Sequence, residues 1–303
     1  MSVSTLDRPR TAAGAPPAPA PRRGVHTPLL SRAVVNTVLV LATVWTVLPL
    51  TWLLISSTKD FAALFGSGGF EFAGFHLTDN LRGLFAEENG IFLRWMLNSV
   101  LYAGAGALLG SFISLCAGYA FDKYAFPGKE KVFGLVLVGV LVPAAATAMP
   151  LYLMASKLGL TNTFWSVFLP GLVNPFGVYL ARVFSSSFVP GELLEASRVD
   201  GAGELFGFFR ISLPLLRPAF ATLFLFSFTA GWNSFYLPLL MLSDHHLYPV
   251  SLGLYQWKTT LAVIPDRYPL VIIGSLVAVL PVVLAFFSLQ RHWKAGLTSG
   301  AVK

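Results

Sequence analysis

Residues 268–290 read YPLVIIGSLVAVLPVVLAFFSLQ, a run that contains no Asp, Glu, Lys or Arg. An α-helix rises about 1.5 Å per residue, so a run of this length can cross the roughly 30 Å hydrocarbon core of a membrane. Five more apolar runs of comparable length cover residues 33–56, 95–121, 132–155, 163–184 and 218–242. The sequence therefore predicts an all-α membrane protein with six transmembrane helices.

The composition points the same way. Of the 303 residues, 55% are hydrophobic and only 12% are charged, whereas an ordinary soluble domain carries roughly a quarter charged residues. The single cysteine, Cys116, lies within the second apolar run. This excludes an intramolecular disulfide and a multi-cysteine metal site.

The distribution of positive charge predicts the orientation. If the N-terminus is cytoplasmic, fifteen of the 21 Lys and Arg residues lie in cytoplasmic segments, whereas the acidic residues divide equally between the two sides. Only the cations are expected to report orientation. Both termini are therefore expected in the cytoplasm, and the net charge of +7 needs no nucleic acid to explain it.

The runs and their connections suggest four regions. Residues 1–30 are rich in Pro, Ala and Arg and are expected to be a disordered cytoplasmic tail. Residues 31–94 are expected to contain the first transmembrane helix, as an uncleaved anchor, and an extracytoplasmic segment. Residues 95–290 would form the transmembrane core, and residues 291–303 a second cytoplasmic tail.

One connection breaks the apolar pattern. Residues 190–214 read PGELLEASRVDGAGELFGFFRISLP. Pro190 suits the first turn of a helix, and two glutamates follow near the positive end of the helix dipole, so we expect a short helix over 190–199. Two glycines interrupt it before a second short helix at 204–211. Its small residues would let a partner approach closely, and the alternative is an amphipathic connector on the bilayer surface.

The spacing within this segment resembles a known motif. Glu195-Ala196-Ser197 is followed after three residues by Gly201, after nine more by Ile211, and then by Leu213-Pro214. This pattern is similar to the EAA motif in permease subunits of bacterial ABC importers, with Ser197 in place of the usual second alanine. The similarity extends over about 95–303 and is strongest to the shorter maltose-type permeases of carbohydrate importers.

The resemblance implies the type I ABC importer permease fold, with a coupling helix between the fourth and fifth transmembrane helices. In that family the coupling helix sits in a cleft of the ATPase subunit. The residues that carry over as the ATPase-coupling surface are Glu195, Ala196, Ser197, Asp200, Gly201 and Ala202. Those that carry over as the junction to the fifth span are Ile211, Leu213 and Pro214.

The resemblance also implies the partners of the chain. They are a second homologous permease subunit, two cytoplasmic ATPase subunits, an extracytoplasmic solute-binding protein and the lipid of a bacterial cell membrane. The sequence contains no Gly-x4-Gly-Lys-Ser/Thr loop. We therefore expect no catalytic residue and no cofactor in this chain, with ATP and Mg used by the ATPase partner.

The solute path is sought where aromatic rings and amides meet, because sugars stack on aromatic faces and hydrogen-bond to amides. Trp232, Asn233, Phe235 and Tyr236 combine these groups near the expected middle of the fifth span. Asn174, before a proline, is a weaker candidate. The alternatives are interhelical packing for the first group and helix capping for Asn174.

Other readings are left open. Asp244-His245-His246 could bind a metal, but adjacent histidines in a short loop favour simple solvation, and no metal site is predicted. The solute could be another compound, such as glycerol phosphate or an amino acid, since the EAA segment reports the ATPase interface and not the cargo. An ion-coupled carrier or a membrane enzyme would need buried ionisable residues that the six runs do not show.

Overall fold

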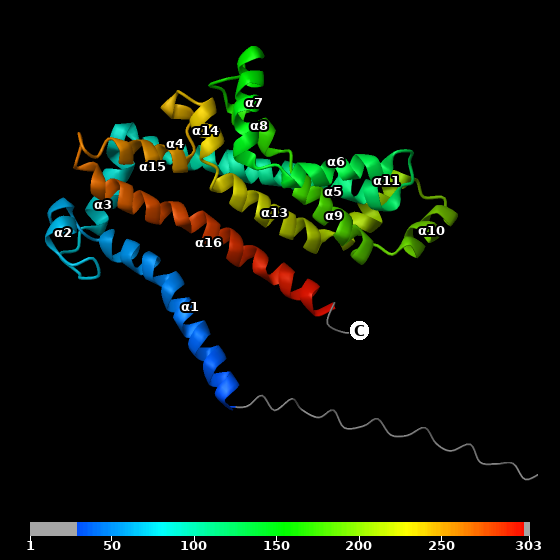
Figure 1. The fold of residues 1–303 in the computed structure, drawn as a ribbon, viewed down its shortest axis with the longest axis horizontal. Helices are drawn as coiled ribbons and strands as arrows, with labels where there is room; N and C mark the ends of the chain where they lie inside the picture. Colours follow the sequence, from blue (N-terminus) through cyan, green and yellow to red (C-terminus); the bar gives the residue numbers. More distant parts are fainter. Residues whose placement is uncertain (1–28, 300–303) are drawn as a thin grey trace, which may run out of the picture. The chain divides into compact units, whose positions relative to one another are not determined.

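The computed structural model describes residues 29–299, with side chains for residues 30–290 (Figure 1). Within these residues all regular secondary structure is helical, which confirms the predicted all-α fold. The tail expected at 1–30 lies outside the described residues except for its last two positions. The chain forms two compact units, Met1–Pro49 and Leu50–Lys303.

The first unit is described as the first part of helix α1, which runs from Leu29 to Ser56 and contains Pro49. Its apolar side chains are exposed all round, including Leu41 and Trp45. The hydroxyls of its threonines are satisfied inside the helix, since Thr43 Oγ1 donates to the Leu39 carbonyl at 2.7 Å. A helix that is apolar on every side is typical of a membrane span.

The second unit contains the remaining helices. They are α2 (Phe61–Gly66), α3 (Leu77–Ala86), η1 (Glu87–Asn89), α4 (Ile91–Ser99), η2 (Val100–Ala105), α5 (Gly106–Lys123), α6 (Lys129–Leu141), α7 (Ala144–Lys157), α8 (Phe164–Gly171), α9 (Pro175–Phe188), α10 (Gly191–Val199), α11 (Glu204–Phe206), η3 (Gly207–Ser212), α12 (Leu213–Leu215), α13 (Arg217–Trp232), α14 (Tyr236–Met241), η4 (His245–Leu247), α15 (Val250–Thr259) and α16 (Arg267–Ser299). Helix α16 thus continues into the range expected as the second tail.

Four helical stretches are long and apolar enough to span a membrane, and two bent pairs bring the number to six if each pair is one span. The single stretches are Leu30–Ser56, Ile91–Lys123, Phe164–Phe188 and Arg267–Gln290. The bent pairs are Lys129–Leu141 with Ala144–Lys157, at 104°, and Glu204–Leu215 with Arg217–Trp232, at 74°. Prolines at or beside both breaks explain the bends, because proline cannot continue the hydrogen-bond ladder of a helix.

The fifth expected span, 218–242, is not one helix. Helix α13 ends at Trp232, and α14 starts only at Tyr236. Its expected middle is therefore a helix end, where Asn233 takes the C-cap position. Sequence reasoning missed this break because the apolar run continues across it.

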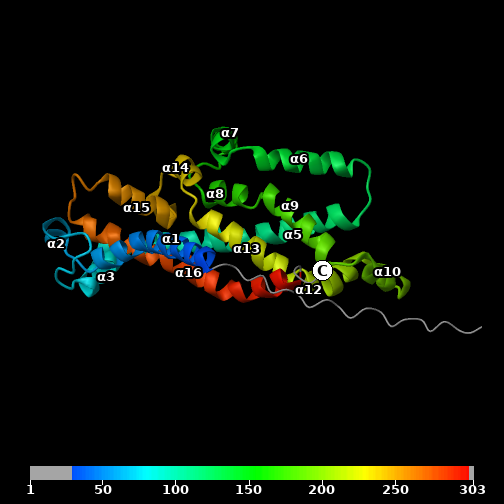
Figure 2. The same cartoon turned by 60° about the horizontal axis from the view of Figure 1, so that its bottom comes forward.

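Five long helices of the second unit lie side by side in the order α16, α13, α5, α9 and α6 (Figure 2). Helix α5 is central and meets α9 closely at Gly118. A Cβ added there would lie 2.4 Å from the Ala181 Cβ and 2.5 Å from the Arg182 nitrogen. The two backbones are therefore in direct contact, as small residues allow between membrane helices.

Separate clusters of buried side chains hold the two ends of this unit. At one end Trp95 meets Trp257 edge-on, with ring centroids 4.8 Å apart. At the end that carries α10, the cluster consists of Leu115, Tyr119, Ala181, Val189, Leu194, Phe208, Leu216, Ala219 and Leu223. The 190–214 segment is therefore anchored in a hydrophobic core of its own.

Replacing Gly118 by Ala should lower the free energy of unfolding by about 1–3 kcal/mol, because the added methyl group overpacks the contact with α9. Thermal unfolding of the detergent-purified protein measures the change. Gly134→Ala on α6 is the matched control, since nothing lies within 4 Å of its added Cβ, and alanine favours helix. Equal unfolding midpoints for the two variants would contradict the close contact.

Candidate functional site

The 190–214 segment forms a short helix, a sharp turn and a return path into α13. Helix α10 follows Pro190, as the sequence predicts, and ends in a Schellman turn. The Gly201 nitrogen donates to the Arg198 carbonyl at 3.0 Å and the Ala202 nitrogen to the Ser197 carbonyl at 2.9 Å. Gly201 has a φ of +81°, which explains the glycine at this position.

The second expected short helix is present but irregular. Helix α11 passes into η3, a π-helical stretch, and then into α12 before the chain bends at Leu216 into α13. Leu216 is fully buried at this bend. The stretch predicted at 204–211 is therefore helical, but most of it is π-helix, whose turns are wider than those of an α-helix.

Most of α10 is exposed. Leu194 alone is buried and fixes the helix to the core. On the outer side Glu195, Ala196, Asp200 and Gly201 are exposed, and Val199 is 88% exposed. The described surface thus presents two carboxylates beside small and aliphatic groups.

Two candidate residues point partly inward. Ser197 is half-buried, and its Oγ donates to the Leu194 carbonyl within the same helix at 2.8 Å. Ala202, the last residue of the Schellman turn, is also half-buried. The Ser197 hydroxyl, which departs from the EAA pattern, therefore has a hydrogen-bond acceptor within its own helix and needs none from a partner subunit.

An ion pair braces the turn. Arg198 Nε donates to Glu204 Oε1 at 2.8 Å, and Arg198 Nη2 donates to Glu204 Oε2 at 3.2 Å. About half of each side chain is exposed, so this pair contributes modestly to stability. Burial raises the pKa of the Tyr124 hydroxyl, and the nearby Glu204 carboxylate raises it further.

Sequence reasoning missed Tyr119 as a support of this segment. Its buried ring lies 4.9 Å from the Phe208 ring, and its hydroxyl accepts a hydrogen bond from Ser212 at 3.3 Å. Both contacts hold η3 on α5. Sequence spacing does not reveal this contact, because 93 residues separate Tyr119 from Ser212.

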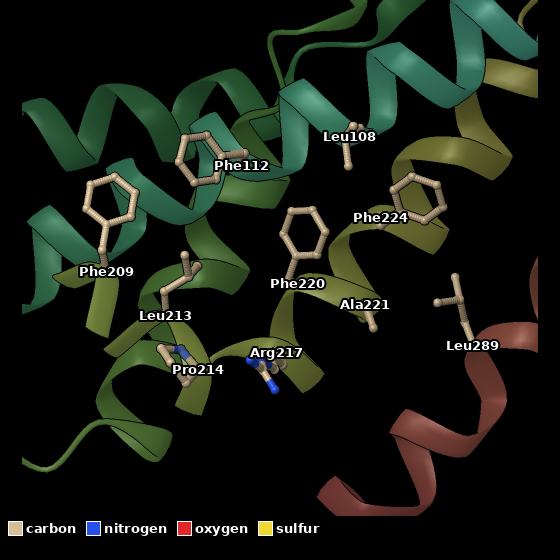
Figure 3. A pocket seen from close by; sticks show the side chains of 10 residues that line it. All are labelled: Leu108, Phe112, Phe209, Leu213, Pro214, Arg217, Phe220, Ala221, Phe224 and Leu289. Atoms are coloured by element: carbon tan, nitrogen blue, oxygen red, sulfur yellow. The ribbon is translucent and has the colours of Figure 1, made fainter. Parts of the chain in front are cut away.

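Two of the three junction residues lie beside a cavity. Ile211 and Leu213 are half-buried and Pro214 is exposed. Leu213 and Pro214 help line a cavity of about 600 Å³, whose walls come from α5, η3, α12, α13 and α16 (Figure 3). The other lining residues are Leu108, Phe112, Phe209, Arg217, Phe220, Ala221, Phe224 and Leu289. Leu213 and Pro214 therefore have open space beside them within the part of the chain that the structure describes.

The solute-path candidates do not converge on one site. Trp232 is buried, and its Nε1 donates to the Ala278 carbonyl on α16 at 3.1 Å, so it joins two helices. Asn233 is exposed and bonds the Thr229 carbonyl of its own helix at 2.9 Å. Phe235 is half-buried, whereas Tyr236 is exposed.

Asn174 occupies the N-cap of α9. Its Oδ1 accepts from the Gly177 nitrogen at 2.8 Å, and its Nδ2 donates to Ser227 Oγ on α13 at 3.1 Å. Both functional ends of the amide are thus engaged. This geometry favours the capping interpretation that the sequence left open.

The Asp244-His245-His246 loop does bring three possible ligand atoms within 4.8 Å of one another. Its backbone also binds side chains of α4, because Trp95 Nε1 donates to the His245 carbonyl at 2.8 Å and Asn98 Nδ2 to the His246 carbonyl at 2.8 Å. Asp244 Oδ1 accepts from the His246 nitrogen at 2.8 Å. The bonds from Trp95 and Asn98 tie the loop to α4.

The chain is similar to known transport proteins. Residues 111–298 match the model of a family described as "Binding-protein-dependent transport system inner membrane component". The chain is 34% identical over 225 residues to the arabinooligosaccharides transport system permease protein AraQ of Halalkalibacterium halodurans, covering 74% of this chain and 79% of that protein. It is 32% identical to the lactose transport system permease protein LacG of Rhizobium radiobacter, and that match covers 88% of this chain and 94% of LacG.

The fold is also similar to a solved structure. The similar chain belongs to a bacterial ABC transporter involved in the import of the acidic polysaccharide alginate. The TM-score is 0.74 at 19% identity, and the match covers 88% of this chain and 99% of that chain. At this identity the likeness concerns the fold.

Replacing Asn174 by Ala should lower the free energy of unfolding by about 1–2 kcal/mol, because α9 loses its N-cap. Asn174→Ser retains a capping oxygen and should recover most of that stability. Asn233→Ala, at the exposed end of α13, serves as the comparison and should change the unfolding midpoint little. A wild-type midpoint for Asn174→Ala would rule out the capping role.

Proposed function

Because the chain belongs to the family of binding-protein-dependent transport system inner membrane components, we propose that it is a permease subunit of an ATP-driven importer and forms half of the membrane pathway for a carbohydrate. The match over 188 residues supports the permease assignment. The relatives named for arabinooligosaccharides and lactose support a sugar or oligosaccharide as cargo. The chain is a transport subunit and not an enzyme.

The observation that carries the proposal is the geometry of α10. A nine-residue helix stands at one end of the core, with Leu194 buried, Ser197 half-buried and its other residues exposed. Glu195 and Asp200 form no ion pair with any residue that the structure describes. The exposed face is therefore available to a partner of complementary charge, which we assign to the ATPase subunit.

The position of this helix also suits transmission of force. Displacing α10 moves η3 and α12, and the chain then enters α13 through the 74° bend at Leu216. The cavity beside Leu213 and Pro214 gives the junction room to change its angle. Nucleotide-driven closure of two ATPase subunits would thereby reach the membrane pathway.

The remaining partners follow from the family and from the chain's surfaces. The family depends on a binding protein, which would deliver the solute from outside the cell. A second, homologous permease completes the pathway, and lipid or that partner covers the apolar side chains of α1. ATP and Mg act at the ATPase subunits. The excess of Lys and Arg in the terminal segments and in the connections on the α10 side supports a cytoplasmic location for the α10 end and both termini.

Glu195→Lys should abolish uptake, because it reverses a charge at the centre of the docking face. The assay is ATP-dependent uptake of the saccharide into proteoliposomes that contain the complete transporter, and a fall of at least about tenfold is expected. Asp266→Lys is the matched control, since it reverses an exposed charge beside the start of α16. Undiminished uptake by Glu195→Lys, with normal assembly, would refute the docking role.

The cargo class is tested by stimulation of ATP hydrolysis. The assembled transporter and its binding protein are supplied in turn with arabinooligosaccharides, lactose, maltodextrins, glycerol phosphate and amino acids. Hydrolysis should rise several-fold with a saccharide, because only bound cargo triggers closure. Stimulation by glycerol phosphate or an amino acid alone would replace the carbohydrate assignment while leaving the permease assignment in place.

A further inference from the structure

A polar cluster joins the end of α5 to the end of α9. Lys123 Nζ lies 2.9 Å from Asp122 Oδ2 and donates to the Val189 carbonyl at 2.5 Å. Ser185 Oγ on α9 donates to the same Asp122 oxygen at 2.7 Å. The Lys123 and Asp122 side chains are only 12% and 17% exposed. We call these four residues the α5–α9 clasp.

The clasp acts on the residue that introduces α10. Val189 is the C-cap of α9 and immediately precedes Pro190. The last carbonyls of a helix lack partners within it, and the following proline offers no N–H group. Val189 is also buried, so water does not satisfy its carbonyl. Lys123 supplies the missing donor, and its positive charge suits the negative end of the helix dipole.

The ammonium group of Lys123 lies beside an opposite charge. A cation with so little exposure is stable only beside an opposite charge, and Asp122 provides it. Ser185 in turn orients the carboxylate of Asp122 from α9. The cluster is therefore a connected network, in which Lys123 bonds Asp122 and the Val189 carbonyl, and Asp122 also bonds Ser185.

The same end of α5 also holds the chain that leaves α10. The Tyr119 ring packs against Phe208, and its hydroxyl accepts a hydrogen bond from Ser212. The segments before and after α10 are thus both attached to α5. Covalent connection alone would transmit a displacement of α10 to α9 and α13 but not to α5.

We infer that Lys123 and Asp122 are positioning residues that fix α10 to α5, so that a displacement of α10 moves α5 together with α9. This inference rests on the proposed function, in which α10 receives the motion of the ATPase. The contact at Gly118 keeps α5 and α9 together farther along. Three spans, and not only the fifth, thereby respond to one docking helix.

The test measures transport and ATP hydrolysis in the same proteoliposomes containing the complete transporter and binding protein. Lys123→Met removes the charge and keeps much of the apolar stem. Because the docking face is untouched, hydrolysis should persist, while saccharide imported per ATP should fall at least about fivefold. Lys123→Arg retains a charged donor and should restore the ratio to within about twofold of wild type.

Lys131→Met is the matched control, because Lys131 is an exposed lysine on α6 at the same end of the chain's core. Its ratio of transport to hydrolysis should equal the wild-type ratio. A purely structural role for Lys123 would lower both activities together through loss of assembled protein. An unchanged ratio in Lys123→Met would therefore overturn the inference.

Two milder variants keep the test decisive if Lys123→Met does not assemble. Lys123→Gln retains a neutral donor, and Ser185→Ala removes only the 2.7 Å bond to Asp122. A lowered ratio in both supports the clasp, and a wild-type ratio in both overturns it. Failure of the proposed function is distinguishable, since the wild-type complex itself would then import no saccharide on addition of ATP.

Discussion

The direct contact of α5 with α9 at Gly118 is the constraint on which the rest of the α10 end depends. Lipid provides little hydrophobic drive for helices to associate, so close packing and hydrogen bonds must hold them together. The absent side chain lets the two backbones meet beside Ala181. That approach brings Asp122 and Lys123 within reach of Ser185 and Val189. The support of α10 thus begins with one glycine.

At the α10 end of the second unit, some charged side chains form ion pairs within the chain, whereas the carboxylates on the outer face of α10 do not in the described part of the chain. Arg182 pairs with Glu130 at 2.8 Å, and the pairs Lys123–Asp122 and Arg198–Glu204 have similar distances. These pairs hold spans and turns to one another. The carboxylates on the outer face of α10 stay outside such pairs in the described part of the chain. The basic sequence therefore presents a local acidic surface on the helix that is proposed to dock the ATPase.

The sequence predicts the helices well because a run of apolar residues long enough for a membrane leaves the backbone few alternatives. It also predicts the turn at Gly201, since the glycine and the spacing around it are local. The break after Trp232 was missed because apolar character continues through it. Asn174 and Trp232 could not be assigned from sequence, because the partner of a polar group depends on which helix lies beside it. Lys123 was missed for the same reason.

The Schellman turn at Gly201 has a mechanical consequence. Helix α10 cannot lengthen beyond its nine residues, because Gly201 adopts a left-handed conformation and Pro190 closes the other end. At about 1.5 Å per residue its span stays near 13 Å. The helix therefore cannot take up a displacement by adding turns at either end. If the ATPase displaces α10 as proposed, the helix would move at constant length and pass the displacement to the residues that hold its two ends.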